Sequence, residues 1–136
     1  MSNQVFASQG VPYFGEFIDI VQTFTGTAAG PPTGVGTVRW SRLGPRTVKC
    51  SIVAFPSVVA WNNSSTISTP IPVGFIPSND TVAYCTLIFA GAAQLSTCLA
   101  STTGFLTFEQ VDAVGSVRAI PNNTTFTTNV FIWDTL

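Results

Sequence analysis

Short stretches in which apolar and polar side chains alternate recur along the chain, separated by clusters of Gly, Pro and Asn. Alternation with a period of two is typical of β-strands, and no stretch of ten or more residues shows the 3.6-residue period of a capped helix. The pattern predicts eight strands, at Phe17–Phe24, Thr37–Leu43, Thr47–Phe55, Thr66–Ile71, Val82–Phe89, Ala92–Leu99, Phe105–Val111 and Phe126–Trp133. Eight short strands in 136 residues predict a single all-β domain, a jelly-roll-like antiparallel β-sandwich.

Two of these strands carry apolar side chains on both faces. In the last strand, Val130 and Ile132 point to one side while Phe131 and Trp133 point to the other, and Val82–Phe89 shows the same arrangement. A sandwich has only one interior, so a second apolar face needs cover from outside the domain. Another copy of the chain is the simplest cover, and the pattern therefore predicts a homo-oligomer.

The composition shows that few charges are available for the surface. Only 8% of the residues are charged and 46% are hydrophobic, whereas an average soluble domain has about 25% charged residues. Ser and Thr supply the polar surface instead, with 12 and 19 residues. The formal net charge of −1 provides no electrostatic attraction to nucleic acid, so we expect no nucleic-acid partner.

The residues that carry most catalytic chemistry are missing or badly spaced. There is no histidine, which excludes Ser-His-Asp and Cys-His catalysis and every histidine metal site. Glu16 with Asp19 and Glu109 with Asp112 are each three apart, so on strands they point to opposite faces and cannot act as a glycosidase pair. Calcium binding at Asp80 or Asp112 stays open as a minor alternative. We expect a protein that is not an enzyme and has no cofactor.

The cysteines and the longest uncharged segment have structural interpretations. Cys50, Cys85 and Cys98 are odd in number and widely spaced, which predicts buried free thiols and assembly in a reducing compartment. The segment Val82–Ala100 has nearly the length of a membrane span. Its polar residues and the break at Gly91 favour two strands joined by a turn, so we expect no membrane insertion.

One hairpin carries a recognisable motif. The run Val38-Arg39-Trp40-Ser41-Arg42-Leu43-Gly44, followed by Thr47-Val48-Lys49-Cys50-Ser51, resembles the aromatic-x-Arg-x-Gly hairpin of small all-β domains in viral and phage structural proteins. Further matching segments follow in the expected order, at Ile67–Pro72, Phe105–Phe108 and Phe126–Trp133. The turn Gly44-Pro45-Arg46 is one residue longer than the Gly-Asn turn of that family, which leaves the register of the next strand open.

The resemblance implies a jelly roll similar to C1q and tumour-necrosis-factor domains, over residues 15–136. Such domains form homotrimers with the C-terminal strand near the threefold axis, and the family brings no catalytic residues. Residues 1–14 precede the matching region, carry no charge and lack the features of a secretory signal, which predicts an N-terminal anchoring arm. Together with the apolar faces, this predicts a trimer interface at Tyr84, Phe131 and Trp133.

The expected function is that of a viral structural protein. It would form a homotrimeric cap, decoration or fibre head on the virion surface, assembled in the host cytoplasm. Its partners would be its own copies and either other capsid proteins or a host surface receptor or glycan.

Trp61 lies in a predicted loop beside Asn62 and Asn63, and these three residues form a predicted recognition loop. The structural alternative is that Trp61 folds back onto the sandwich. If the loop aromatic stacks on a sugar, the alternative function is a soluble carbohydrate-binding module. Five asparagines begin Asn-x-Ser/Thr sequences, although a preference for Asn and Thr on a charge-poor surface also explains them: Asn62, Asn63, Asn79, Asn122 and Asn123.

Four of the five basic residues, Arg39, Arg42, Arg46 and Lys49, lie in one predicted hairpin. They are either a basic patch for an acidic partner or anionic glycan, or solvated side chains that protect a sheet edge.

Overall fold

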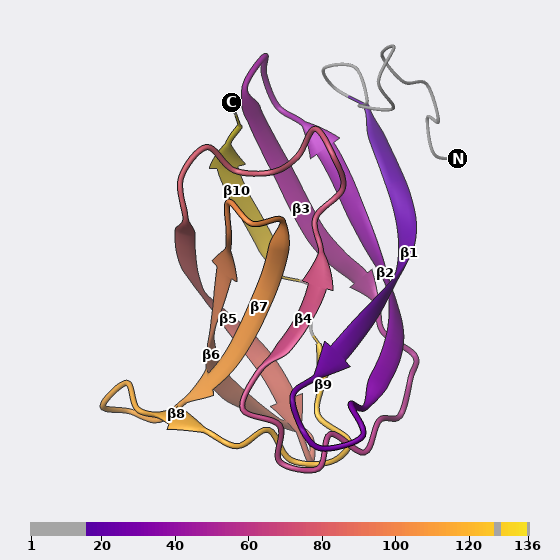
Figure 1. Ribbon diagram of the computed structural model, residues 1–136, viewed down its shortest axis with the longest axis vertical. Coiled ribbons are helices and arrows are strands. Elements are labelled where there is room, and N and C mark those ends of the chain that lie inside the picture. The colour runs from indigo at the N-terminus through magenta and orange to yellow at the C-terminus, as the bar shows by residue number, and fades with distance from the viewer. Residues whose placement is uncertain (1–15, 127–128, 136) are drawn as a thin grey trace.

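The computed structural model describes residues 16–126 and 129–135. These residues form ten β-strands joined by turns and loops, with no helix (Figure 1). The all-β prediction is confirmed, and seven of the eight predicted strands match one observed strand each to within a few residues. The strands are β1 (Phe17–Gly26), β2 (Thr33–Arg42), β3 (Thr47–Ala54), β4 (Ile67–Pro70), β5 (Thr81–Phe89), β6 (Ala92–Ala100), β7 (Phe105–Val111), β8 (Val117–Arg118), β9 (Thr125–Phe126) and β10 (Val130–Asp134). The predicted arm, residues 1–14, and residue 15 lie outside the described residues.

The strands form one curled antiparallel sheet in the order β10-β3-β2-β1-β4-β7-β6-β5-β9, with β8 added beside β7. The sheet folds into two layers because β1 and β4 share only two residue pairs, Thr25 with Ser68 and Gly26 with Ile67. Strands β1 to β4 lie in the order β4-β1-β2-β3, which is a Greek key, and β4 to β7 form a second one in the opposite chain direction. Two Greek keys are compatible with a jelly-roll-like sandwich.

The inward side chains of both layers form one core. Phe24 of β1 packs against Phe108 of β7, and Phe108 packs against Phe131 of β10, with ring centroids 6.3 and 6.1 Å apart. The indole of Trp40 donates to the Gln22 side chain at 2.7 Å, so this buried polar group is satisfied. Each fully buried large apolar side chain stabilises the fold by about 1.5–3 kcal/mol.

Two glycines of β2 let the chain cross over it after β3. A Cβ atom on Gly36 would lie 2.6 Å from the Phe55 ring, and one on Gly34 would lie 2.5 Å from Val59. The crossing segment needs this space to seat Phe55 edge-on against Phe24, with ring centroids 5.2 Å apart. Any larger side chain at these two positions would push the segment away from the core.

The hairpin turn at residues 43–46 does not shift the register that the sequence left open. Trp40 pairs with Cys50 and Arg42 with Val48, while the only irregularity of this pair lies between Thr37 and Val38. Alternation along β3 therefore continues directly from the turn.

The predicted strand Phe126–Trp133 is divided in two. Phe126 in β9 pairs with Leu87 of β5, whereas β10 pairs with β3 in the other layer. The chain therefore passes from one layer to the other between β9 and β10. The pairing of Val117 with Val111, which creates β8, was not predicted.

The uncharged segment Val82–Ala100 forms the β5–β6 hairpin, as predicted. Its turn residues Ala90 and Gly91 both have positive φ, 52° and 77°, which is the geometry of a tight two-residue hairpin turn. Within the described residues there is no helix long and apolar enough to cross a bilayer.

Candidate functional site

The two strands with two apolar faces, β5 and β10, do not pair; they flank a gap that is linked at its two ends, and we call this gap the seam. At one end of this seam, the Asn129 side chain bonds the backbone of Thr86. At the other end, the Ser78 amide donates to the Asp134 carbonyl at 2.9 Å. Between these points, and within residues 16–126 and 129–135, no strand pairs with either facing edge.

The backbone groups along the seam point into it. Alternate residues of a strand direct their N–H and C=O groups to the same edge. Because Thr86 and Asp134 bond across the seam, the alternate residues Val82 and Tyr84 of β5 and Val130 and Ile132 of β10 also direct their backbone groups into it. The same residues carry exposed apolar side chains on the outer face. Val82 is 66% exposed, Tyr84 77%, Val130 55% and Ile132 53%. We call these four residues the seam patch.

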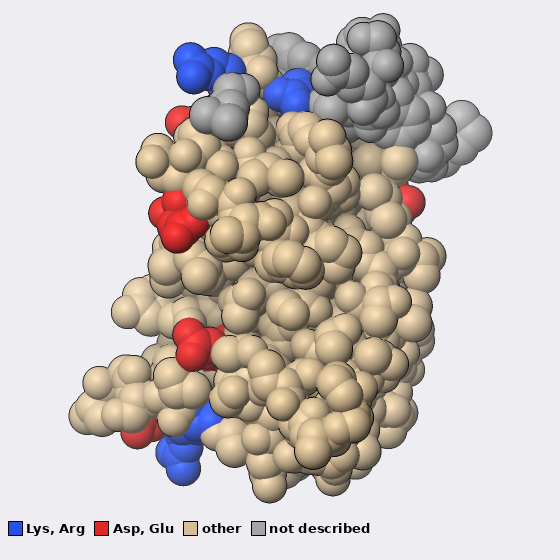
Figure 2. All heavy atoms as spheres, viewed as in Figure 1, with Lys and Arg blue, Asp and Glu red and all other residues tan. Residues whose placement is uncertain are grey.

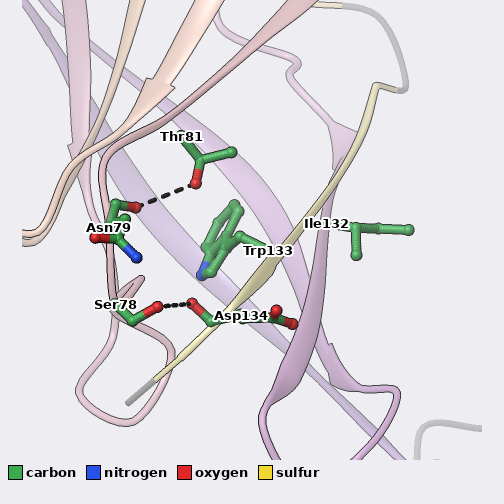
Figure 3. Close-up of a pocket in the computed structure, with 6 residues that line it drawn as sticks. All are labelled: Ser78, Asn79, Thr81, Ile132, Trp133 and Asp134. Carbon is green, nitrogen blue, oxygen red and sulfur yellow. Dashed lines mark hydrogen bonds between the residues drawn. The ribbon is translucent and has the colours of Figure 1, made fainter.

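A groove of about 370 Å³ lies in the seam. It is lined by Ser78, Asn79, Thr81, Ile132, Trp133 and Asp134. In Figure 3 the Trp133 ring lies toward Thr81 and Asn79, while Ile132 and the Asp134 carboxylate lie on the other side of β10.

The hydroxyls of this seam groove bond to backbone within the chain. Thr81 donates to the Asn79 carbonyl at 3.1 Å, and Ser78 donates to the Asp134 carbonyl at 3.3 Å. Their oxygens can still accept hydrogen bonds, and the groove adds the Asn79 amide. The groove is therefore a polar depression within an apolar patch.

The predicted trimer interface needs a correction at two of its three residues. Phe131 and Trp133 are only 4% and 5% exposed, because both lie in the core of the single chain. Trp133 packs edge-on against Trp40 at 6.0 Å and donates its indole N–H to the Phe75 carbonyl. Alternation places neighbours on opposite faces but does not say which face is inside. Tyr84 is exposed, and its place in an interface stays a prediction.

The predicted recognition loop needs a correction at Trp61. Its side chain is fully buried, and the indole N–H donates to the Thr124 carbonyl at 2.8 Å. The structural alternative is therefore the one observed. Asn62 and Asn63 are exposed at the turn, with φ of 53° and 59°, and the Ser64 amide closes it on the Trp61 carbonyl. Asparagine tolerates this left-handed conformation, which gives both residues a structural role.

The other paired asparagines lie against this turn. The Asn62 amide donates to the Asn122 side chain at 2.7 Å, so two turns that are 60 residues apart share one end of the sandwich. Asn122 and Asn123 are both exposed there, whereas Asn79 lines the seam groove. Four of the five Asn-x-Ser/Thr sequences therefore cluster at one end.

The predicted basic patch is divided between two sites. Arg39, Arg42 and Lys49 line a pocket of about 250 Å³ together with Phe17, whereas Arg46 lines a different one beside Asp134. Arg42 donates to the Pro45 and Gly74 carbonyls, which is a structural role in the turn.

Arg39 is already neutralised on the outer face of β2. It makes two bonds of 2.8 and 2.9 Å to the Asp19 carboxylate and lies 4.1 Å from the Phe17 ring centroid. The hydrogen bond from Arg39 holds the pKa of Asp19 below its usual value. Of the four basic residues, Lys49 and the exposed Arg46 have neither an ion pair nor a side-chain hydrogen bond to another residue among those described.

The three thiols lie in the core, as predicted. Cys50, Cys85 and Cys98 are buried and free, and burial raises the pKa of each, that of Cys85 to about 12. Within the described residues, no three His, Cys, Asp or Glu side chains gather in a way that could hold a metal ion.

Sequence reasoning identified the right strands for the seam patch but named the wrong members of β10. It missed the groove residues Ser78 and Asp134, because they come together only when β10 crosses to the other layer. Comparison of the chain with protein-family models, with curated proteins and with solved structures finds no match in any of the three.

Proposed function

We propose that this protein is a non-catalytic structural subunit that assembles with copies of itself through the seam patch. The observation that carries the proposal is the exposure of four apolar side chains on the two strands that flank the seam: Val82, Tyr84, Val130 and Ile132. Single exposed apolar side chains are common on soluble proteins, whereas several of them on strands that flank one gap are typical of an interface.

Assembly removes this apolar surface from water, at about 25 cal/mol per Å². The charge of the chain offers little resistance, since its formal net charge is −1 and charged side chains are sparse on the face seen in Figure 2. Between Thr86 and Asp134, no strand among the described residues pairs with the two facing edges, so their backbone groups are available to a neighbouring copy. The physical features thus favour a protein–protein contact over a site for a small molecule.

We further propose that the assembly is a homotrimer on a virion surface, as a cap, decoration or fibre head. The support is the resemblance of the Val38–Gly44 hairpin to viral all-β domains, together with a sandwich built from two Greek keys. Its partners would then be capsid proteins or a host receptor or glycan, and its place the virion assembled in the host cytoplasm. The carbohydrate-module alternative has no exposed stacking residue to support it, because Trp61 is buried.

The test is the native mass by light scattering, for the wild type and for Ile132→Asp. We expect the wild type to have a mass near three times 14.4 kDa, and the variant to have the mass of a single chain, near 14.4 kDa. Val58→Asp is the matched control, since Val58 is 82% exposed and lies away from the seam, and it should leave the mass unchanged. A monomeric wild type at high protein concentration would overturn the proposal.

A further inference from the structure

The seam patch is apolar, but one end of the seam is polar and is built from three segments that lie far apart in the sequence. The Thr135 amide donates to the Arg46 carbonyl at 2.6 Å, and the Ser78 amide donates to the Asp134 carbonyl at 2.9 Å. Pro77 and Thr135 also form an isolated antiparallel β-bridge. Backbone contacts thus join the turn after β2, the segment before β5 and the end of β10, so the surface between them has a fixed shape.

Two pockets adjoin where these segments meet. The seam groove has a volume of about 370 Å³, and the second pocket has a volume of about 350 Å³. Ser78 and Asp134 line both, and the second pocket adds three further residues: Arg46, Thr47 and Thr135. Both volumes lie in the range of about 300–1,000 Å³ that is typical of pockets for small ligands. We call the two pockets together the polar end of the seam.

The hydroxyl groups of the polar end have their protons fixed within the chain. All four donate to the Asp134 carboxylate or to a backbone carbonyl, over 2.8 to 3.3 Å: Thr47, Ser78, Thr81 and Thr135. A hydroxyl that has donated its proton can only accept further hydrogen bonds. The four hydroxyls therefore favour a ligand that brings several hydrogen-bond donors.

The two charges of the polar end lie apart from one another. Arg46 and Asp134 line the same pocket, yet they form no ion pair within residues 16–126 and 129–135. The hydrogen bond from Thr47 orients the Asp134 carboxylate through Oδ1, so Oδ2 can accept from a ligand. Because one cation and one anion cancel, the pocket favours a neutral ligand over an ion.

A neutral molecule with many hydroxyl groups satisfies this arrangement. Each sugar hydroxyl donates one hydrogen bond and accepts others, so it can donate to the fixed hydroxyls and to Asp134 and accept from Arg46 and from the exposed Asn79 amide. An apolar molecule would leave these polar groups without partners, which costs free energy. A metal ion would face the Arg46 charge, and no group of three metal-ligating side chains exists among the described residues.

We propose that the polar end of the seam binds a neutral oligosaccharide. One sugar unit lies at Asn79 and Thr81 in the seam groove, and the next lies between Arg46 and Asp134 in the adjoining pocket. Ser78 lines both pockets and contacts the linkage. In Figure 3 Asn79 and the Asp134 carboxylate lie on opposite sides of β10, so a ligand that reaches both is longer than one sugar ring.

The affinity of one copy is weak. Trp133 is the one aromatic residue that lines the polar end in the described part of the chain, and it is only 5% exposed, so stacking on a sugar adds little. Each hydrogen bond to the ligand replaces one to water, and we expect a dissociation constant of about 1 mM per copy. Three linked copies raise the apparent affinity by about a hundredfold or more. The useful affinity therefore rests on the proposed function, which names a glycan among its partners.

Titrations followed by saturation-transfer NMR test the site, with maltose, lactose and N-acetyllactosamine as neutral probes and 3′-sialyllactose as the acidic one. We expect the neutral probes to bind, because hydroxyl pairs are common to all three. Asn79→Ala and Asp134→Asn should each raise the dissociation constant by about tenfold. The matched controls are Asn123→Gly, which removes an exposed amide at the other end of the sandwich, and Glu109→Gln on β7, and both should bind as the wild type does.

The same samples, measured by light scattering, separate this site from the proposed function. If the wild type is a trimer but binds no neutral probe at about 10 mM, the saccharide site is overturned and the proposed function stands. Neutral binding that survives both Asn79→Ala and Asp134→Asn, or binding of 3′-sialyllactose alone, also overturns the site. A wild type that is monomeric and binds a neutral probe through Asn79 and Asp134 overturns the proposed function and supports the site.

Discussion

The side-chain amide of Asn129 binds the backbone of Thr86 as a neighbouring strand would. Its Nδ2 donates to the Thr86 carbonyl at 2.9 Å, and the Thr86 amide donates to its Oδ1 at 3.3 Å. This happens where the chain leaves the edge of β5 after β9 and crosses to β3. A side chain thus continues the ladder at the point where the backbone departs from it.

Replacing Asn129 with alanine should lower the free energy of unfolding by about 1–3 kcal/mol, because a strand edge loses a donor and an acceptor together. Asn129→Asp keeps the acceptor and loses the donor, so it should lower the free energy of unfolding by a similar or larger amount. Urea unfolding measures both. Asn79→Ala removes an exposed amide that bonds nothing through its side chain among the described residues, and it should change the stability little. Equal stability of Asn129→Ala and the wild type would contradict the bridging role.

Trp61 should behave as a core residue and not as a ligand contact. Trp61→Ala removes a fully buried indole and should cost about 3–5 kcal/mol of unfolding free energy. Trp61→Phe keeps most of the packing but leaves the Thr124 carbonyl without its donor, which should cost about 1–3 kcal/mol. Chemical denaturation followed by fluorescence of the remaining tryptophans gives both values. Wild-type stability in either variant would contradict the role of Trp61 as a core residue.

The positions of Trp61 and of Phe131 show how far the sequence determines this fold. Alternation predicted the strands well, including both ends of Phe105–Val111, since each strand has its own pattern. It fixed which side chains of β10 share a face, but both sets are apolar, and only packing between the layers decides that Phe131 and Trp133 go inside.

The candidate site was predictable only in part. Tyr84 was named from the pattern of β5, and its exposure on the outer face agrees with the choice of that strand. The groove depends on the contact between Ser78 and Asp134, which lie 56 positions apart and have no local signal. The two-residue strand β8 is too short to show alternation, so the β7–β8 hairpin was missed.

The Arg39–Asp19 pair should make a small, pH-dependent contribution to stability. The hydrogen bond from Arg39 lowers the pKa of Asp19 from 3.8, so the folded state binds the proton more weakly than the unfolded chain. The contribution is therefore complete above pH 3.8 and disappears as the pH falls through the lower folded pKa.

Both side chains are partly exposed, at 40% and 29%, so solvent screening keeps the contribution below about 1 kcal/mol. The measurement is the unfolding free energy of the wild type and of Asp19→Asn between pH 6 and pH 2. The difference between the two should shrink toward the acidic end, and 1 M salt should reduce it at neutral pH. A difference that grows on acidification would show that the pair is not the cause.

The three thiols should be unreactive until the protein unfolds. Burial raises the pKa of all three cysteines, so almost no thiolate is present at pH 8 and reagents have no access. A colourimetric disulfide reagent should therefore report no free thiol in the folded protein and all three in denaturant. Of the three, Cys85 is the least buried and should react first as denaturant is added. Rapid reaction of any thiol in native buffer would contradict this expectation.

The passage of the chain from β9 to β10 also sets the order in which the molecule can fold. Thr47 meets Asp134 across 87 positions, and the Thr135 hydroxyl meets the Arg46 carbonyl across 89. Contacts between residues so far apart form slowly, because a long loop must close before they stabilise anything. Hairpins such as β5–β6 need no such closure. We therefore expect β10 to dock last, after the other strands of both layers have paired. This single late step should set the folding rate of the whole domain.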